Sequence, residues 1–337
     1  MDTKSLNAVA MQMVAPGKGI LAADESPKTA TKRFENIGVS CTEDSRRAYR
    51  EMLFTAPGIG KYISGVILHD ETIRQSAANG ESLVAVLEAA GILPGIKVDQ
   101  GTKAMDGSPE EKITTGLDGL SARLEEYVKL GAKFAKWRAV ITIGNGLPTD
   151  ANLQQNAKDL AAYARLCQEA ALVPIVEPEV LMDWSNDMEG CERVSERNLT
   201  FVFEELSKAG VVLEGMILKT NMVVPGKQSG EAMIPEKVAE ATVRLFRKVL
   251  PQNLTGEAFL SGGQSEIEAT ENLNAIAKLG PFPWNLSFSY GRALQDSAMK
   301  TWAGKTEHVP TAQKILYHRA QMNGLATLGK YKGESGD

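Results

Sequence analysis

Histidine and cysteine are scarce in this sequence. Its 337 residues include three cysteines and three histidines: Cys41, Cys167 and Cys191; His69, His308 and His318. An odd, widely separated set of cysteines argues against a disulfide framework and against a thiolate metal cluster, so a reducing compartment fits best. Because catalytic metal sites usually draw on histidine ligands, we expect no metal cofactor. Each histidine is better interpreted as a surface or packed side chain.

Long apolar runs and a strong charge of one sign are also lacking. No apolar run approaches the ~20 residues that span a bilayer, and residues 1–19 lack the continuous apolar core of a signal peptide. Lysine and arginine (37) nearly balance aspartate and glutamate (42), which gives a net charge of −5. We therefore expect neither nucleic acid nor a membrane as the main partner. A cytoplasmic location is predicted, or the plastid stroma if a transit peptide has been removed.

The glycine-rich signatures of nucleotide-binding folds are missing as well. No dinucleotide fingerprint follows a first strand, and SGGQS (261–265) is too short and wrongly spaced for a P-loop. The sequence has no low-complexity segment and no linker that would divide it. A single domain over residues 1–337 is therefore predicted.

One pattern recurs along the whole chain. Eight short apolar runs each end in polar or charged residues, at 19–25, 63–70, 93–99, 132–140, 172–180, 213–221, 257–263 and 286–292. Between them, stretches such as 117–131, 156–170, 196–210 and 235–250 carry apolar residues at the three- and four-residue spacing of amphipathic helices. Eight such units predict an α/β fold, a (β/α)₈ barrel, rather than two doubly wound domains. The barrel core is expected over about 19–300, with a helical segment and short tail at 301–337.

Charged residues at the ends of these runs form the candidate site, because barrel active sites lie at the C-terminal ends of the strands. The ends carry Asp24, Lys97, Asp99, Lys136, Arg138, Glu177, Glu179, Lys219, Ser261, Ser289 and Arg292. Any one of these residues taken alone is as well explained by a strand end that meets solvent. The set is not, because Lys136 and Glu177 lie inside apolar sequence, where an unpaired charge is expensive.

Lys219, in LEGMILKTNM (213–222), follows an apolar run directly. A lysine in a desolvated pocket beside other cations loses part of its proton affinity, and its neutral amine can attack a carbonyl to form a Schiff base. Lys136 and Lys97 would supply the neighbouring charge, and Glu177 could move protons during dehydration. Glycines in Ser261-Gly262-Gly263 and Tyr290-Gly291-Arg292 lie where barrels often bind phosphate through backbone N–H groups, although plain tight turns remain an alternative.

Seven motifs, in this order and over nearly the whole chain, resemble class I fructose-bisphosphate aldolase. They are GKGILAADES (17–26), GIKVD (95–99), FAKWR (134–138), VPIVEPE (173–179), LEGMILK (213–219), FLSGGQSE (259–266) and FSYGRALQ (288–295). The resemblance implies a (β/α)₈ barrel that cleaves fructose 1,6-bisphosphate reversibly into dihydroxyacetone phosphate and glyceraldehyde 3-phosphate. It also implies metal independence and a homotetramer.

Roles follow from the same resemblance where the motifs match. Lys219 would form the Schiff base with Glu177 as its principal acid/base partner, and Asp24 would orient the imine and assist carbon–carbon cleavage. Lys136 would assist at the C4 hydroxyl, and Glu179 would hydrogen-bond within this cluster. The C1 phosphate would be bound by Ser261, Gly262, Gly291 and Arg292, with Gly263 and Ser289 nearby. The other phosphate or the sugar hydroxyls would be bound by Lys97, Ser26, Arg33 and Arg138.

Three departures from the family pattern stand out. Thr220 follows the lysine where proline is usual, which restores a backbone N–H. Pro27 and Lys28 replace the usual small residues near the second phosphate. Finally, the sequence stops at GKYKGESGD (329–337), without the longer flexible tail ending in tyrosine that is familiar in animal and plant members. The last tyrosine is Tyr331, and KYKGESGD (330–337) offers it no apolar anchor.

Two other interpretations remain open at this point. Another Schiff-base barrel enzyme, similar to transaldolase or deoxyribose-phosphate aldolase, shares the lysine chemistry but should lack the VEPE and SGGQS motifs. A scaffold that binds cytoskeletal or membrane partners through a basic mouth would need no catalytic lysine. The choice among fructose 1,6-bisphosphate, fructose 1-phosphate and sedoheptulose 1,7-bisphosphate is not set by the sequence.

Overall fold

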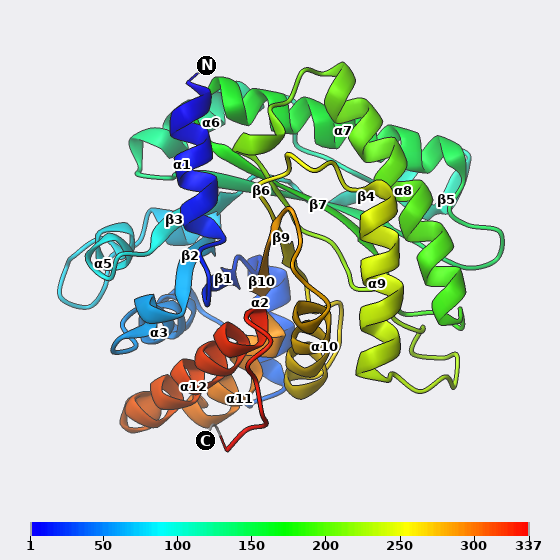
Figure 1. Cartoon of the computed structure of the whole chain (residues 1–337). Coiled ribbons are helices and arrows are strands. Elements are labelled where there is room, and N and C mark those ends of the chain that lie inside the picture. The colour runs from blue at the N-terminus through cyan, green and yellow to red at the C-terminus, as the bar shows by residue number, and fades with distance from the viewer. Residues whose placement is uncertain (1, 336–337) are drawn as a thin grey trace.

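Eight parallel strands close into a barrel, as a computed structural model that describes residues 2–335 shows (Figure 1). The order around the barrel is β1-β10-β9-β8-β7-β6-β3-β2. The strands are β1 (Gly19–Ala23), β2 (Ile63–Leu68), β3 (Leu93–Lys97), β6 (Phe134–Ile141), β7 (Val173–Val180), β8 (Ile217–Leu218), β9 (Gly256–Phe259) and β10 (Asn285–Tyr290). Each predicted run overlaps one of them, with β6, β9 and β10 each extending one residue beyond the run, so the predicted (β/α)₈ barrel is confirmed.

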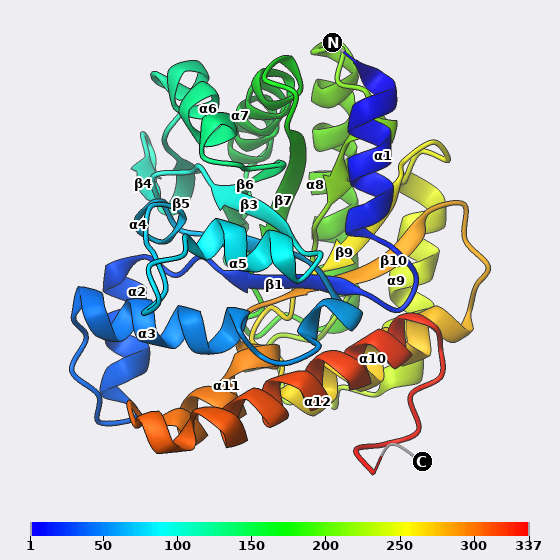
Figure 2. The same cartoon turned by 90° about the vertical axis from the view of Figure 1, so that its left-hand side faces the viewer.

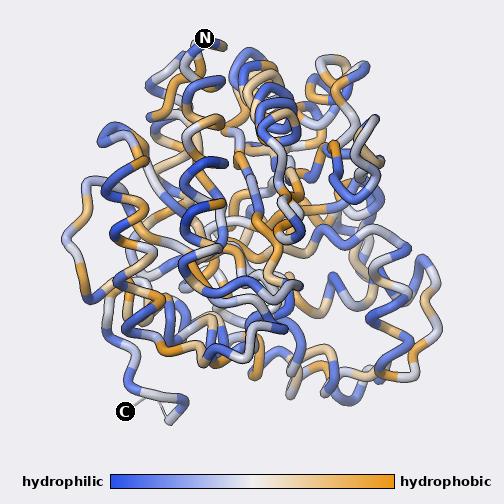
Figure 3. The backbone as a smooth tube through the Cα atoms, turned by 90° about the vertical axis from the view of Figure 1, so that its right-hand side faces the viewer, coloured by the Kyte–Doolittle hydropathy of each residue, from blue (hydrophilic) through white to orange (hydrophobic). Residues whose placement is uncertain are grey.

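Helices fill the connections and surround the barrel (Figure 1). They are α1 (Thr3–Met13), α2 (Pro27–Glu35), α3 (Glu43–Phe54), α4 (Asp70–Ile73), α5 (Leu83–Ala89), α6 (Leu120–Lys129), α7 (Asp150–Glu169), α8 (Met188–Lys208), α9 (Pro235–Val249), α10 (Glu266–Lys278), α11 (Arg292–Trp302) and α12 (Val309–Thr327). Figure 3 shows hydrophobic and hydrophilic turns alternating along the outer helices. No helix within residues 2–335 has both the length and the apolar character to cross a bilayer.

The four predicted helical stretches are confirmed, but two helices begin earlier than the apolar spacing indicates. Helix α7 begins at Asp150 because the Thr149 side chain accepts a hydrogen bond from the Asn152 N–H. Helix α8 begins at Met188 because Asp187 accepts from the Gly190 N–H. Such N-caps satisfy backbone donors at a helix start, and their signal lies outside the apolar repeat.

Helix α1 packs at the N-terminal end of the barrel, where it contacts β2 and β7 (Figure 2). Its buried residues Leu6, Ala10 and Met13 pack with barrel residues. The barrel residues of this cluster include Ile20, Phe134, Val173, Ile175, Ile217 and Ala258. Close packing extends across the interior: a Cβ added to Gly95 would lie 2.1 Å from the Phe134 ring. This apolar layer fills the barrel interior toward the N-terminal ends of the strands.

A two-stranded antiparallel sheet, β4 (Thr102–Met105) with β5 (Ser108–Thr114), was not predicted. Its turn contains Asp106-Gly107, with Gly107 at φ +80°, a dipeptide typical of tight hairpins. The buried Glu111 on β5 accepts hydrogen bonds from the Thr149 N–H and hydroxyl, both at 2.8 Å. These bonds fasten the hairpin to the start of α7.

Tyr331 is anchored, so the expectation that KYKGESGD gives it no apolar anchor is wrong. The side chain is 7% exposed and belongs to the main hydrophobic core. Its N–H donates to Asn274 Oδ1 at 3.0 Å, and its hydroxyl donates to Glu334 Oε1 at 2.8 Å. A tyrosine ring can pack in a core while its hydroxyl finds a polar partner; here Glu334 is that partner, and Asn274 on α10 holds the backbone N–H.

Candidate active site

One large cavity, of about 1300 Å³, opens at the C-terminal ends of the barrel strands. Its lining includes every predicted site residue except Gly263: Asp24, Ser26, Arg33, Lys97, Lys136, Arg138, Glu177, Glu179, Lys219, Ser261, Gly262, Ser289, Gly291 and Arg292. Residues far apart in the sequence are thus gathered at one mouth. Parallel strands produce this convergence because their C-terminal ends share one edge of the barrel.

Four charged side chains form a continuous row of ion pairs across the cavity floor. Lys219 Nζ lies 3.1 Å from Glu177 Oε1, and Lys136 Nζ lies 3.5 Å from Glu177 Oε2 and 2.7 Å from Asp24 Oδ2. Lys219, Glu177 and Lys136 are 4%, 3% and 4% exposed. These charges are buried, and each has a partner of opposite sign, which is the condition for tolerating them away from water.

The protonation of this cluster follows from its geometry. Burial by itself would raise the pKa of Asp24, but the ammonium groups of Lys136 and Lys219 outweigh it and leave that pKa well below its usual range. Burial likewise opposes the charge on Lys136, yet Asp24 and Glu177 raise its pKa above the ordinary value. Asp24 is therefore a carboxylate and Lys136 an ammonium at neutral pH.

Two further ion pairs line the cavity wall beside this row. Lys97 Nζ lies 2.5 Å from Asp99 Oδ1, and Arg138 Nε donates to Glu179 Oε2. Burial opposes the charge of Arg138, but the Glu179 carboxylate raises its pKa overall. The pair joins two neighbouring strands, with Arg138 on β6 and Glu179 on β7.

The predicted phosphate donors lie across the barrel from these pairs, where β9 and β10 end. Gly291 precedes α11 as its N-cap and makes no side-chain capping bond, so backbone N–H groups of the first turn are available to an anion. Gly262 and Gly263 have φ of +57° and +91°, which glycine adopts without strain. The buried Ser289 hydroxyl has no hydrogen-bond partner among the described residues.

The comparison with protein-family models decides the interpretation. Residues 5–337 match the model for fructose-bisphosphate aldolase class-I. The chain belongs to the class-I fructose-bisphosphate aldolases.

Individual relatives of this aldolase agree over its full length. It is 52% identical over 334 residues to a probable class 1 fructose-bisphosphate aldolase of Xanthomonas axonopodis, covering 99% of this chain and 100% of the relative. It is 53% identical to the cytosolic fructose-bisphosphate aldolase 4 of Arabidopsis thaliana, covering 99% of this chain and 85% of the relative. The predicted family, aldolase activity class and fold are confirmed, and they set aside the transaldolase-like alternative.

A solved structure resembles the aldolase fold closely. The Plasmodium falciparum fructose-bisphosphate aldolase, solved in complex with TRAP and a small-molecule inhibitor, superposes with a TM-score of 0.97 at 49% identity. The match covers 98% of this chain and 96% of that one. The two barrels therefore share their architecture throughout.

After β1 and beside α11, two of the predicted ligands of the aldolase cavity already have partners. The Ser26 hydroxyl accepts from the Thr29 N–H at 3.4 Å and caps α2, with Pro27 as the first helical residue. Arg33 pairs with Glu25, and its Nη2 lies 3.0 Å from Asp296 Oδ1. An anion bound here would have to share or displace these partners.

Lys227, beside the predicted phosphate donors, was not predicted from the sequence. A Cβ added to Gly263 would lie 2.6 Å from Lys227 Nζ and 3.6 Å from Arg292 Nη2, so both cations flank this glycine. Lys227 also lies 2.9 Å from Asp183. It lies in a loop after Pro225-Gly226, away from any strand end, so no strand-end pattern would reveal it.

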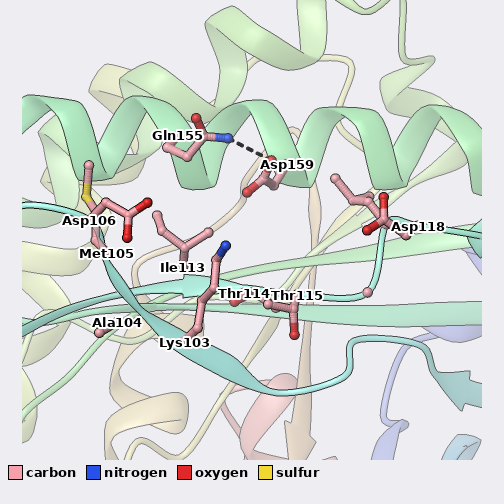
Figure 4. Close-up of a pocket in the computed structure, with 12 residues that line it drawn as sticks. Lys103, Ala104, Met105, Asp106, Ile113, Thr114, Thr115, Asp118, Gln155 and Asp159 are labelled. Atoms are coloured by element: carbon pink, nitrogen blue, oxygen red, sulfur yellow. Dashed lines mark hydrogen bonds between the residues drawn. The ribbon is translucent and has the colours of Figure 1, made fainter. Parts of the chain in front are cut away.

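A second pocket of the aldolase, about 410 Å³, lies between the β4–β5 hairpin and α7 (Figure 4). Its lining includes Lys103 and Asp159, and Gln155 Nε2 donates to Asp159 Oδ1 at 2.9 Å. It contains none of the predicted site residues. Within residues 2–335, no group of three or more histidine, cysteine, aspartate or glutamate residues is arranged to hold a metal ion.

Proposed function

We propose that this aldolase cleaves fructose 1,6-bisphosphate reversibly into dihydroxyacetone phosphate and glyceraldehyde 3-phosphate, through an imine on Lys219. The observation that carries the proposal is the buried pair of Lys219 and Glu177, 3.1 Å apart, on the floor of a cavity of about 1300 Å³. Membership of the class-I family supports it. A buried amine can form a Schiff base, and an adjacent carboxyl group can move the protons that the reaction needs.

The first half of the reaction forms the imine. Lys219 passes its proton to Glu177, and the resulting neutral amine attacks the C2 carbonyl of the open-chain ketose to give a carbinolamine. Glu177 moves the protons that allow the carbinolamine hydroxyl to leave as water, and a protonated imine remains. Its positive charge is then the sink for the electron pair of the neighbouring carbon–carbon bond.

The second half breaks the C3–C4 bond. The C4 hydroxyl gives up its proton to the Asp24 carboxylate, and the C3–C4 electron pair moves toward the imine to leave an enamine and glyceraldehyde 3-phosphate. The Lys136 ammonium stabilises charge on the C4 oxygen, which its raised pKa supports. The proton held by Asp24 then passes to C3 of the enamine, which restores the carboxylate and the imine, and water hydrolyses the imine to release dihydroxyacetone phosphate and the free lysine.

The two phosphates occupy opposite ends of the cavity in this proposal. Ser261, Gly262, Gly263, Ser289, Gly291 and Arg292 bind the C1 phosphate, with backbone N–H groups at the start of α11 as support. Lys97, Ser26, Arg33 and Arg138 bind the other phosphate or the sugar hydroxyls. Glu179 holds Arg138 in place through their ion pair.

The remaining features of the proposal rest on the family. We take the protein to be a cytoplasmic homotetramer built from a single barrel domain over residues 1–337, with no metal cofactor. Relatives named cytosolic in Arabidopsis thaliana and cytoplasmic in Cicer arietinum support the location.

Trapping with borohydride tests the proposed function directly. Reduction in the presence of dihydroxyacetone phosphate, followed by peptide mapping, should leave a stable adduct on Lys219. Lys136, equally buried and close to Glu177, is the internal control and should stay unmodified. An enzyme that remains active while its Lys219 is unmodified would rule out the mechanism.

Metal removal provides the complementary test. Cleavage of fructose 1,6-bisphosphate should be unchanged after prolonged dialysis against EDTA, because the protonated imine supplies the electron sink. Activity that is lost on dialysis and restored by zinc would contradict this proposal.

A further inference from the structure

A buried acid lies directly behind the lysine cluster and has no part in the chemistry described so far. Glu257 is the second residue of β9 and is 0% exposed. Its neighbour Ala258 packs inside the barrel, whereas Phe259 packs in the outer core between strands and helices. Because side chains alternate along a strand, Glu257 faces the helices with Phe259, outside the substrate cavity.

The Glu257 carboxyl group has one hydrogen bond among the described residues. The Thr220 N–H donates to Glu257 Oε1 at 3.1 Å, and Oε2 has no partner. Burial raises the pKa of Glu257 well above its usual range, and the Thr220 N–H and Lys219 only partly oppose this. Burial thus favours the uncharged form of this acceptor over a carboxylate counter-ion for Lys219.

The position of that hydrogen bond in the barrel is significant. Strand β8 has only two residues, Ile217 and Leu218, and it pairs with β9 at Leu218 opposite Glu257. Beyond it, the Lys219 N–H donates to the Val176 carbonyl of β7 at 2.8 Å. The next N–H, that of Thr220, has a side chain as its acceptor where a longer strand would offer a backbone carbonyl.

The Thr220 N–H cannot be left without this acceptor at low cost. Thr220 is buried, so water does not reach its amide freely, and a buried donor without an acceptor is strongly unfavourable. On the other side of the residue, the Thr220 carbonyl accepts from the Leu260 N–H at 3.0 Å. Glu257 thus completes the set of bonds that holds the peptide joining Lys219 to Thr220.

We propose that Glu257 is a positioning residue for Lys219. By accepting the Thr220 N–H from behind the strand, it fixes the backbone from which Lys219 reaches the substrate carbonyl and Glu177. This inference rests on the proposed role of Lys219 as the imine-forming residue. Glu257 contacts no substrate and transfers no proton.

Two variants at position 257 separate the acceptor from the acid. Glu257→Gln keeps an uncharged side-chain oxygen of the same length, whereas Glu257→Met keeps the length and removes the strong acceptor. The rate of borohydride-trapped imine with dihydroxyacetone phosphate should fall roughly 10- to 100-fold in Glu257→Met, the effect of one buried donor left unpaired. It should stay within about threefold of wild type in Glu257→Gln. A Glu257→Gln variant as slow as Glu257→Met would overturn the proposal.

A double-mutant cycle with Thr220→Pro isolates the hydrogen bond, because proline has no N–H to donate. Within the Thr220→Pro background, adding Glu257→Met should change the imine rate by less than about threefold. An equal loss in both backgrounds would mean that Glu257 acts only through packing. If Glu257→Met alone does not fold, the double variant decides: recovery of folding and trapping supports the hydrogen bond, and failure of both rejects it.

The same experiment distinguishes this inference from the proposed function. Wild-type protein without an adduct on Lys219 would remove the proposed function itself. Wild-type protein trapped on Lys219, together with Glu257→Met trapped at the same rate, would remove only the role of Glu257. Affinity for inorganic phosphate, whose predicted site lies on other residues, should be unchanged in every variant.

Discussion

The two ends of the barrel are built from the same strands but consist of opposite kinds of residue. On three neighbouring strands, an interior apolar residue is followed two positions later by a buried charge: Phe134 and Lys136, Ile175 and Glu177, Ile217 and Lys219. A spacing of two keeps both side chains on the inner face of the strand. A step of about 7 Å along each strand thus separates the packed layer from the reactive one.

The difference shows that the barrel separates stability from chemistry within single strands. Each large side chain in the apolar layer contributes about 1.5–3 kcal/mol to stability through burial. The charges above it must be desolvated, and their pairing largely offsets that penalty without adding a comparable gain. Substitutions in the two layers should therefore affect different measurements.

The largest expected effect is that of Lys219→Met in the charged layer. The variant should form no borohydride-stable adduct, because methionine has no amine to attack the ketose. Its thermal unfolding should change less than that of an apolar-layer variant, since Glu177 keeps Lys136 as a partner. Lys219→Met that still yields a trapped protein would place the nucleophile elsewhere.

Asp24→Ala should have the next largest effect. It leaves Lys219 in place, so imine should still form, while cleavage of the carbon–carbon bond should slow by ~10²–10⁴-fold through loss of a proton-transfer group. Single-turnover kinetics with fructose 1,6-bisphosphate would separate the two steps. Asp24→Asn, which keeps the shape without the charge, is the matched variant. Wild-type turnover in either variant would show that the assignment of Asp24 is wrong.

Phe134→Ala tests the apolar layer. The ring is fully buried and lies close to Gly65 and Gly95, so its removal leaves a cavity and should lower the free energy of unfolding by about 3–5 kcal/mol. Phe134→Leu should lose less, and denaturant unfolding would measure both. Trapping on Lys219 per folded molecule should be nearly unchanged. A stable Phe134→Ala protein without adduct would break the proposed separation of the two layers.

Arg292→Ala should have the smallest effect of the four. Loss of a charge-assisted phosphate contact should weaken binding of C1-phosphorylated ligands by about 1.5–3 kcal/mol. Calorimetry with dihydroxyacetone phosphate would measure the change. Arg244→Ala, which removes an exposed arginine paired with Glu192 on the outer surface, is the control and should bind normally. Equal weakening toward an unphosphorylated ketose would exclude the proposed phosphate contact.

The sequence predicted the barrel strands and their charged ends because both leave a local signal. An apolar run that ends in a charge identifies a barrel strand and its reactive end together, as GMILK does for Lys219. The β4–β5 hairpin left little signal because Thr102–Met105 is mostly exposed and lacks an apolar run. Its Asp106-Gly107 turn was the available clue.

Contacts between distant segments could not be predicted in the same way. Glu257 was interpreted as the start of an ordinary strand run. Nothing near it in the sequence indicates that it accepts a hydrogen bond from the N–H of Thr220, 37 residues earlier. Lys227 approaches Gly263 only through the fold of two loops. Tyr331 gained its anchor from Asn274 on α10. Each depends on tertiary placement, which apolar spacing does not encode.

The pairing of β1 with β10 bears on how the chain folds as it is synthesised. Ile20 leaves the ribosome long before Ser289, its partner in the barrel. Until residues 285–290 emerge, β1 and β9 both present open strand edges, which are prone to pair with other chains. A nascent chain that stalls before this point cannot close a barrel, and its two unpaired strand edges stay exposed to other chains. We therefore expect the cell to shield the growing chain until its last strand closes against its first.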